Sequence, residues 1–191
     1  MQPAVTWIGH ATVLAQLGGI NLLTDPHFSQ RASPLSFIGP KRQLEPGVAL
    51  AALPHIDVVL ISHNHYDHLD EASVRALAAQ PGGSPLFIVP LGLKAWFADC
   101  GIGNVIGLEW WQSHRVEGAN GPVEVVLTPV QHWSGRGLTD RMQTLWGGYT
   151  VFAPDQHLFS AAIPAIRKTS PISASASRAG SPGRKEASIS R

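Results

Sequence analysis

Short apolar runs separated by turn-forming residues characterise the beginning of the chain. Residues 5–8, 12–17 and 20–23 are rich in β-branched and apolar side chains, and Gly18 and Gly19 separate the last two runs. A Gly-Gly pair between two such runs is typical of a β-hairpin turn. The pattern predicts strands over these runs, and the five prolines between residues 26 and 54 predict a long loop after them.

Continuous apolar runs alternate with helical patterns in the middle of the chain. Residues 56–62 (IDVVLIS) suit a buried strand, and residues 70–77 combine acids in the first turn with apolar side chains at helical spacing. We expect further strands at residues 86–89, 105–108, 123–130 and 148–152, and a second helix at residues 91–100. Strands that alternate with helices are typical of a layered α/β domain.

Composition places the chain among folded proteins. Hydrophobic residues make up 44% and charged residues 14%, which excludes a wholly disordered chain. The single cysteine, Cys100, cannot form an internal disulfide and fits a reducing compartment. No apolar run approaches the roughly 20 residues of a transmembrane helix, and the N-terminus lacks the pattern of a signal peptide. We therefore expect a cytoplasmic protein.

Charge and composition change abruptly near residue 160. Residues 1–159 carry 8 Lys and Arg against 12 Asp and Glu, whereas residues 160–191 carry 6 against 1. The last 32 residues also hold 8 Ser and 7 Ala and no aromatic residue. We interpret residues 160–191 as a disordered tail; a basic arm for nucleic acid or anionic lipid is the alternative. The acidic body, residues 1–159, argues against a nucleic-acid partner.

The motif with the clearest chemistry directly follows the buried strand at residues 56–62. His63, His65, Asp67 and His68 place three imidazoles and one carboxylate within six residues. Residues two apart in extended backbone point the same way, so His63 and His65 can bind one ion while Asp67 and His68 face the other side of the turn. Imidazole and carboxylate are ligands that Zn²⁺ accepts, and the lack of thiolates argues against a structural zinc site. The motif therefore predicts two metal ions.

The other histidines differ in their sequence context. His132 follows the strand predicted at residues 123–130 and should approach the same edge as a further metal ligand. His10 follows Gly9 at the end of the first strand, where it is either a group that orients a ligand or substrate, or a packed core histidine. Four histidines lack any such context and are interpreted as structural: His27, His55, His114 and His157.

Several motifs taken together resemble a known family. The metal motif, with Gly9-His10 and Thr24-Asp25-Pro26 upstream, resembles the metallo-β-lactamase superfamily, an αββα sandwich with a binuclear metal site at one edge. Seven segments are similar to N-acyl-phosphatidylethanolamine-hydrolysing phospholipase D and its bacterial relatives: residues 5–12, 23–26, 31–34, 39–42, 61–70, 89–92 and 131–133. The resemblance covers residues 4–159. It predicts a partial domain at residues 1–159, about the N-terminal half to two-thirds of such a sandwich.

The resemblance implies a site and an activity. It implies one zinc ion at His63, His65 and His132 and a second at Asp67 and His68, with the four motif residues in the catalytic role. The implied reaction is hydrolysis of the phosphodiester of N-acyl-phosphatidylethanolamine to an N-acylethanolamine and phosphatidic acid. Zinc suits this reaction because it lowers the pKa of water and neutralises phosphoryl oxygens. A phospholipid substrate would also imply a peripheral membrane contact.

Other substrates and other roles remain open at the level of sequence. The metal motif alone also fits a hydrolase of a lactone, a thioester or a nucleic-acid phosphodiester. Trp110, Trp111 and Trp133 face either lipid or the core, and the core is favoured because aromatic residues of a sandwich are more often buried.

The chain departs from the family after Phe159. Family members continue with Phe-Ser-Gly-Asp-Thr-Gly-Tyr, whose Asp bridges both metals, and later supply a last His; residues 159–167 here read FSAAIPAIR. If suitable codons are chosen for the family segment, deletion of a single base shifts the reading frame and gives the residues observed here. We therefore hypothesise that residues 160–191 are translated out of frame, which the DNA sequence around codon 160 tests. With only Asp67 and His68 for the second zinc, we expect fewer than two bound ions, and an inactive truncated product is the non-enzyme alternative.

Overall fold

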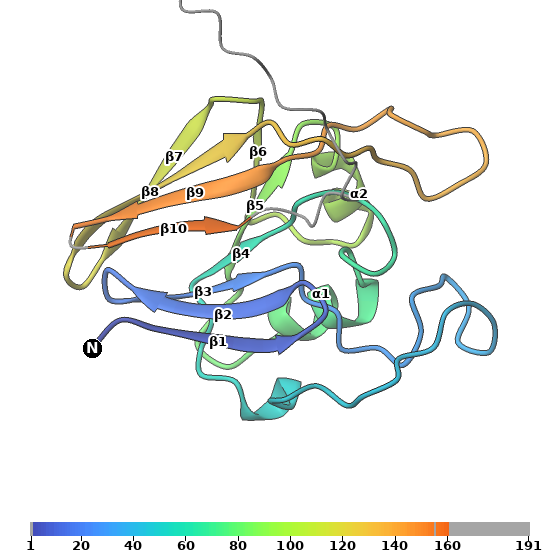
Figure 1. The fold of residues 1–191 in the computed structure, drawn as a ribbon, viewed down its shortest axis with the longest axis horizontal. Coiled ribbons are helices and arrows are strands. Elements are labelled where there is room, and N and C mark those ends of the chain that lie inside the picture. Colours follow the sequence, from blue (N-terminus) through green and yellow to red (C-terminus); the bar gives the residue numbers. More distant parts are fainter. Residues whose placement is uncertain (1, 155, 161–191) are drawn as a thin grey trace, which may run out of the picture.

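Two β-sheets pack face to face, and two helices cover the outer face of one of them, in the computed structural model of residues 2–154 and 156–160 (Figure 1). The strands are β1 (Ala4–Gly9), β2 (Thr12–Leu17), β3 (Ile20–Thr24), β4 (Val58–Leu60), β5 (Leu86–Pro90), β6 (Val105–Leu108), β7 (Ser113–Gly118), β8 (Gly121–Thr128), β9 (Gly148–Ala153) and β10 (Gln156–Ser160). The helices are η1 (Leu50–Ala52, a 3₁₀ turn), α1 (Glu71–Ala78) and α2 (Lys94–Asp99).

The larger sheet has the strand order β1-β2-β3-β4-β5-β6. Strands β1 to β3 are antiparallel, and the predicted hairpin turn between β2 and β3 is confirmed, with φ angles of 61° at Gly18 and 81° at Gly19. Strands β3 to β6 are parallel. Helices α1 and α2 form the crossovers from β4 to β5 and from β5 to β6. The carboxyl ends of β3 and β4 therefore meet at one edge of the sheet.

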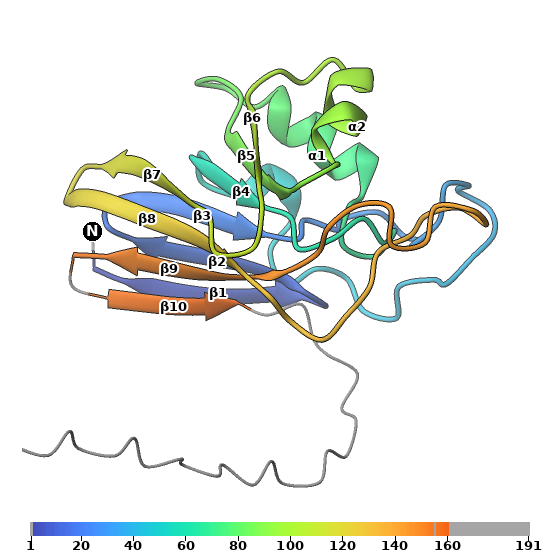
Figure 2. The same ribbon diagram turned by 90° about the horizontal axis from the view of Figure 1, so that it is seen from above.

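The smaller sheet is antiparallel, in the order β10-β9-β8-β7, and packs on the side of the larger sheet opposite to α1 and α2 (Figure 2). Alternate residues of the central strands serve the two layers: Leu22, Val58 and Ile88 join a core between the sheets, while Val59 and Phe87 join a core beneath the helices. Strands covered on both faces need apolar residues at every position. This explains the continuous apolar run that marks β4 in the sequence.

Tyr149 of β9 connects the two sheets. Its hydroxyl group lies 2.9 Å from the carbonyl oxygen of Ile61 and 3.0 Å from that of Ile88, to which it donates. The side chain is fully buried, and burial raises the pKa of the phenol well above its ordinary value. The neutral hydroxyl thus fixes the smaller sheet against the strand that leads into the metal motif.

The predicted layered α/β architecture is confirmed, although the short turn η1 within the predicted long loop and two strands were not predicted. Strands β7 and β10 were not predicted, and they are the two edge strands of the smaller sheet. All of their residues are exposed or half-buried, so they carry little apolar alternation. The predicted tail lies outside the described residues except for Ser160, which ends β10. Within the described part of the chain, no helix combines the length and the apolar character that crossing a membrane requires.

Candidate metal centre

The metal motif occupies the tight turn that follows β4. The backbone N–H groups of His68 and Leu69 both donate to the carbonyl of His65, at 3.0 and 2.8 Å, and so reverse the chain direction within the motif. His63 is fully buried and His68 nearly so, whereas His65 and Asp67 are half-buried. The turn thereby presents His63 and His65 on one side and Asp67 and His68 on the other.

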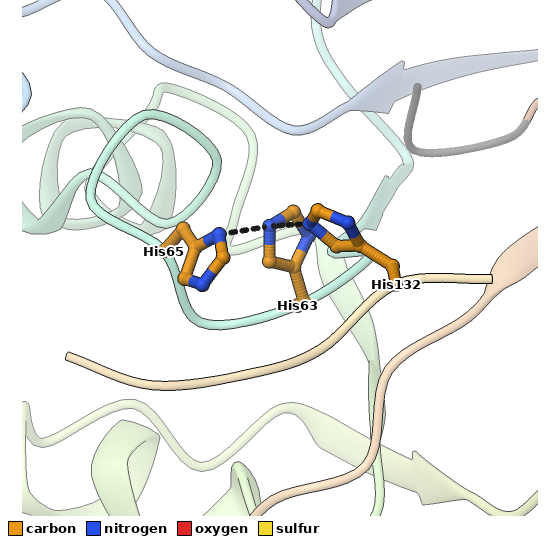
Figure 3. A group of neighbouring side chains, drawn as sticks. All are labelled: His63, His65 and His132. Atoms are coloured by element: carbon orange, nitrogen blue, oxygen red, sulfur yellow. Dashed lines mark hydrogen bonds between the residues drawn. The ribbon is translucent and has the colours of Figure 1, made fainter. Parts of the chain in front are cut away.

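Three imidazoles converge on the first side of the turn. The Nε2 atom of His63 lies 2.8 Å from Nδ1 of His65 and 2.9 Å from Nε2 of His132, and Figure 3 shows the three rings pointing toward one another. His132 arrives from the segment after β8, in the smaller sheet, 69 residues further along the chain than His63. The structure therefore brings together the three histidines that the sequence analysis grouped around one ion.

The hydrogen bonds behind His63 show why this group fits a metal ion. The hydroxyl of Ser62 donates to Oδ2 of Asp25 at 2.7 Å, and so accepts from Nδ1 of His63 at 2.8 Å. Because its proton is then on Nδ1, His63 presents a lone pair on Nε2 to His65 and His132. Three imidazole nitrogens that converge in this way are a ligand set for a tetrahedral divalent ion such as Zn²⁺ with one open position.

A second group of potential ligands lies on the other side of the turn. Oδ2 of Asp67 is 2.8 Å from Nε2 of His10 and 3.6 Å from Nε2 of His68, and the three ligand atoms all lie within 4.8 Å of one another. The sequence analysis left His10 either as an orienting group or as a core residue. The core alternative is wrong, because the side chain of His10 is 45% exposed and lies at the end of β1, beside Asp67.

Asp25 is the residue of this centre to which the sequence analysis assigned no role. It is buried at the end of β3 and accepts hydrogen bonds from the backbone N–H of Ser62 at 2.7 Å and from Nδ1 of His68 at 2.9 Å, besides the Ser62 hydroxyl. The available signal was its position after a strand that runs parallel to β4. The carboxyl ends of such strands share one edge, where binding sites of α/β sheets gather.

Burial and neighbouring charges set the protonation of the centre. Burial, reinforced by the surrounding histidines, lowers the pKa of His63 to about 2, and burial also lowers the pKa of His65 and His132. Burial opposes ionisation of Asp67, but the hydrogen bond from His10 and the charge of His68 hold its pKa below the ordinary value. At neutral pH the three imidazoles are therefore neutral and Asp67 is ionised, which are the forms that bind metal.

His68 behaves differently from the other three imidazoles. Burial lowers its pKa, but the charge of Asp25 and the hydrogen bond to it outweigh burial and raise the pKa above its ordinary value. Asp25 thus holds a proton on Nδ1 of His68 in either ionisation state. The other ring nitrogen, Nε2, faces Asp67.

Arg136 ties the motif turn to the segment that carries His132. Its Nη1 atom donates to the carbonyl oxygens of Asn64 at 3.0 Å and Leu69 at 2.7 Å, and its guanidinium lies 4.0 Å from the centre of the Tyr66 ring. The side chain of Asn64 accepts the N–H of the neighbouring Gly135 at 2.6 Å. These contacts span both ends of the turn and fix its position relative to the smaller sheet.

A cavity of about 780 Å³ opens beside the two ligand groups. His10, His65 and Asp67 contribute to its wall, and the rest of the lining is mainly apolar with two cationic side chains and the acidic Glu45. The apolar and cationic lining includes Trp7, Ile8, Leu44, Trp133, Lys41 and Arg42. The long loop predicted between residues 26 and 54 thus forms much of the cavity, and a volume of this size accommodates a small organic ligand.

The preference for buried tryptophans is wrong for the three residues concerned. Trp111 is 71% exposed in the turn between β6 and β7, where its φ angle is 70°, and Trp110 and Trp133 are also exposed. The turn between strands of different sheets leaves Trp110 and Trp111 outside both cores, and Trp133 lies in the segment between β8 and β9. Trp133 instead packs edge-on against the ring of His65, with 4.3 Å between centroids.

The four histidines interpreted as structural lie outside both ligand groups. His27 is buried against Arg42, whose Nη2 donates to its carbonyl oxygen and to its Nδ1. Nδ1 of His55 lies 3.0 Å from the carbonyl oxygen of Pro81. The other two, His114 and His157, lie on the edge strands β7 and β10.

Comparisons with known proteins show which family and which proteins this chain resembles. Residues 20–165 match the family described as Beta-lactamase superfamily domain. An uncharacterized protein of Mycobacterium tuberculosis is 41% identical over 158 residues, which are 82% of this chain and 41% of that protein. The N-acyl-phosphatidylethanolamine-hydrolyzing phospholipase D 1 of Caenorhabditis elegans is 39% identical over 159 residues, which are 81% of this chain and 44% of that protein. The chain therefore spans less than half the length of these curated relatives.

A solved structure shares the fold. Igni18, a metallo hydrolase from the archaeon Ignicoccus hospitalis, superposes with a TM-score of 0.58 at 21% sequence identity. The alignment covers 82% of this chain and 59% of that one. At this level of identity the similarity shows a shared fold.

Proposed function

The chain belongs to the beta-lactamase superfamily, and from this premise we propose that it is a zinc-dependent hydrolase whose first metal is held by His63, His65 and His132. One observation carries the proposal: three imidazole nitrogens, drawn from both sheets, converge beside a largely apolar cavity. No protein nucleophile is required. The bound ion supplies a Lewis acid and a water molecule of lowered pKa.

The chain's own residues prepare this chemistry in three ways. Ser62 and Asp25 fix the proton of His63 on Nδ1, so that Nε2 is available to a metal. Burial keeps the ligand imidazoles neutral. Arg136 holds the motif turn against the segment of His132, so that the ligands are assembled before a metal binds.

We propose the phosphodiester of N-acyl-phosphatidylethanolamine as the substrate and N-acylethanolamine and phosphatidic acid as the products. The name of the C. elegans relative supports this choice, as does the cavity. Lys41 and Arg42 line it and offer positive charge to a phosphate, while its apolar wall suits acyl chains. Trp7 and Leu44, which line the same cavity, are 68% and 78% exposed, and we propose that they contact the membrane surface from which a lipid would enter.

The test is a hydrolysis assay on the zinc-loaded full chain. N-acyl-phosphatidylethanolamine is supplied in mixed micelles, and both products are quantified by mass spectrometry. We expect turnover that is lost in His65→Ala and His132→Ala but retained in His114→Ala, a histidine variant on an edge strand. Turnover of a lactone or thioester but not of the phospholipid would overturn the proposed substrate. No turnover with any of these compounds would overturn the hydrolase proposal and support the alternative that the chain is an inactive truncated product.

A further inference from the structure

His10 lies where a second metal ion would need a third ligand. The resemblance to the family assigns the second ion only Asp67 and His68 among the described residues, and two ligands bind zinc weakly. In the structure, Nε2 of His10 and Nε2 of His68 both approach Oδ2 of Asp67, at 2.8 and 3.6 Å. We propose that His10 is a ligand of this second metal ion. The inference deepens the proposed function and rests on it.

The backbone around His10 is shaped to present this side chain. The pairing of β1 with β2 is irregular between Trp7 and Gly9, and such irregularities re-aim the side chains that follow. His10 itself has a φ angle of 50°, in the left-handed region that residues other than glycine seldom adopt. The indole N–H of Trp7 donates to the carbonyl oxygen of His10 at 2.9 Å and supports this conformation. Unfavourable backbone conformations that the surroundings enforce are concentrated at functional sites.

The orientation of His68 distinguishes a metal site from a simple pair of His10 with Asp67. A hydrogen bond between one imidazole and one carboxylate needs no second imidazole. Here Nδ1 of His68 is engaged by Asp25 at 2.9 Å, so Nε2 is the nitrogen left for a metal ion, and it faces the carboxylate that His10 also approaches. The His10 and His68 rings meet at 66° with centroids 5.2 Å apart, so both rings approach the carboxylate without stacking on each other.

The composition of this group suits zinc. Two imidazoles and one carboxylate form a common three-residue set for Zn²⁺ that leaves a position for water or substrate. The three ligand atoms lie within 4.8 Å of one another, and they come from the end of β1 and from the motif turn. Small side-chain adjustments therefore bring them around one ion. With His10, the described residues supply three ligands to each of two ions.

Metal stoichiometry tests the proposal independently of activity. The full chain and its variants are stripped with chelator, titrated with Zn²⁺ by calorimetry, and analysed for bound zinc after desalting. We expect two zinc ions for the unaltered chain, and for His10→Ala one zinc ion with the second site weakened at least about 10-fold. His114→Ala is the matched control and should bind two. Circular dichroism verifies that His10→Ala, a change at a half-exposed position, remains folded.

The outcomes separate this inference from the proposed function. Two zinc ions of unchanged affinity in His10→Ala would overturn the role of His10 and leave the hydrolase proposal intact. One zinc ion in the unaltered chain, lost in His132→Ala, would also overturn it, because the second site would not exist. No bound zinc in the unaltered chain would overturn both.

Discussion

Nδ1 of His68 donates to Oδ2 of Asp25 at 2.9 Å, across 43 residues of sequence and between the ends of two parallel strands. The bond determines which nitrogen of His68 carries its proton, and therefore which one can bind a metal ion. Asp25 also accepts the hydroxyl hydrogen of Ser62, which in turn accepts from His63. A single buried carboxylate thus orients one histidine in each of the two ligand groups.

Asp25→Asn should weaken zinc binding without creating a cavity in the core, because the two side chains are nearly equal in size. The asparagine amide is uncharged, and one of its two polar atoms is an NH₂ group that cannot accept the hydrogen bonds from His68 and Ser62. His68 and, through Ser62, His63 therefore lose their fixed orientation. We expect zinc affinity to fall about 10- to 100-fold, measured by calorimetric titration. Asp99→Asn, an exposed change at the end of α2, is the control. Equal affinity in the two variants would show that Asp25 does not position the ligands.

Arg136→Ala should destabilise the motif turn. Removing the guanidinium leaves the carbonyl oxygens of Asn64 and Leu69 without their donor, and an unsatisfied buried polar group costs about 1–3 kcal/mol. We expect a loss of that size in the free energy of unfolding by urea, together with weaker zinc binding. Arg115→Ala on β7 should change neither. Arg136→Lys should recover part of the stability but not all, because lysine cannot reproduce the planar fork.

The metal-free protein should lose stability as the pH falls below about 6.5. The pKa of His63 is about 2 in the folded chain and 6.5 in the unfolded chain, so only the unfolded state binds a proton in between. His63 alone then lowers the free energy of unfolding by about 1.4 kcal/mol for each unit by which the pH falls. His65 and His132 add smaller losses because solvent reaches them, and His68 opposes them because its pKa is raised.

Urea unfolding of the chelator-treated protein at pH 7, 6 and 5 measures this dependence. His63→Asn should flatten the curve, since asparagine does not titrate, whereas His114→Ala should leave it unchanged. A free energy of unfolding that stays constant or increases toward pH 5 would contradict the assignment of a neutral His63.

Chelation should lower the melting temperature of the zinc-loaded protein. A ligand present at 100 times its dissociation constant stabilises the folded state by about 2.7 kcal/mol, which for a domain of this size corresponds to about 5–10 °C. Differential scanning calorimetry with and without chelator measures the shift. The shift should be smaller in His132→Ala, which lacks a ligand of the first group. An identical shift in that variant would place the stabilising ion elsewhere.

Lys41→Ala should weaken binding to anionic lipid. Lys41 is exposed and lines the cavity, and a lysine near an anionic membrane contributes about 1 kcal/mol. We expect about a five-fold lower affinity for phosphatidic-acid vesicles in a sedimentation assay. Lys94→Ala, a change at another exposed lysine, at the start of α2, should have no effect. Equal losses in both variants would indicate general charge attraction.

Local sequence patterns predicted most of the elements, the three residues of the first ligand group, and two of the three residues of the second. The apolar run before His63 predicts β4 because a strand covered on both faces needs apolar residues throughout, and the spacing of the motif predicts two sides of a turn. Edge strands carry no such pattern, because solvent tolerates any polar side chain there. That is why β7 and β10 escaped prediction.

Only the tertiary structure decided which distant residues complete the centre. Nothing near His10 or Asp25 in the sequence shows that one lies 2.8 Å from Asp67 and the other 2.9 Å from His68. Their positions depend on the irregular end of β1 and on the parallel pairing of β3 with β4, which are contacts between segments far apart in the chain. Periodicity reports what each residue faces within its own element, whereas ligand geometry depends on how the elements pack.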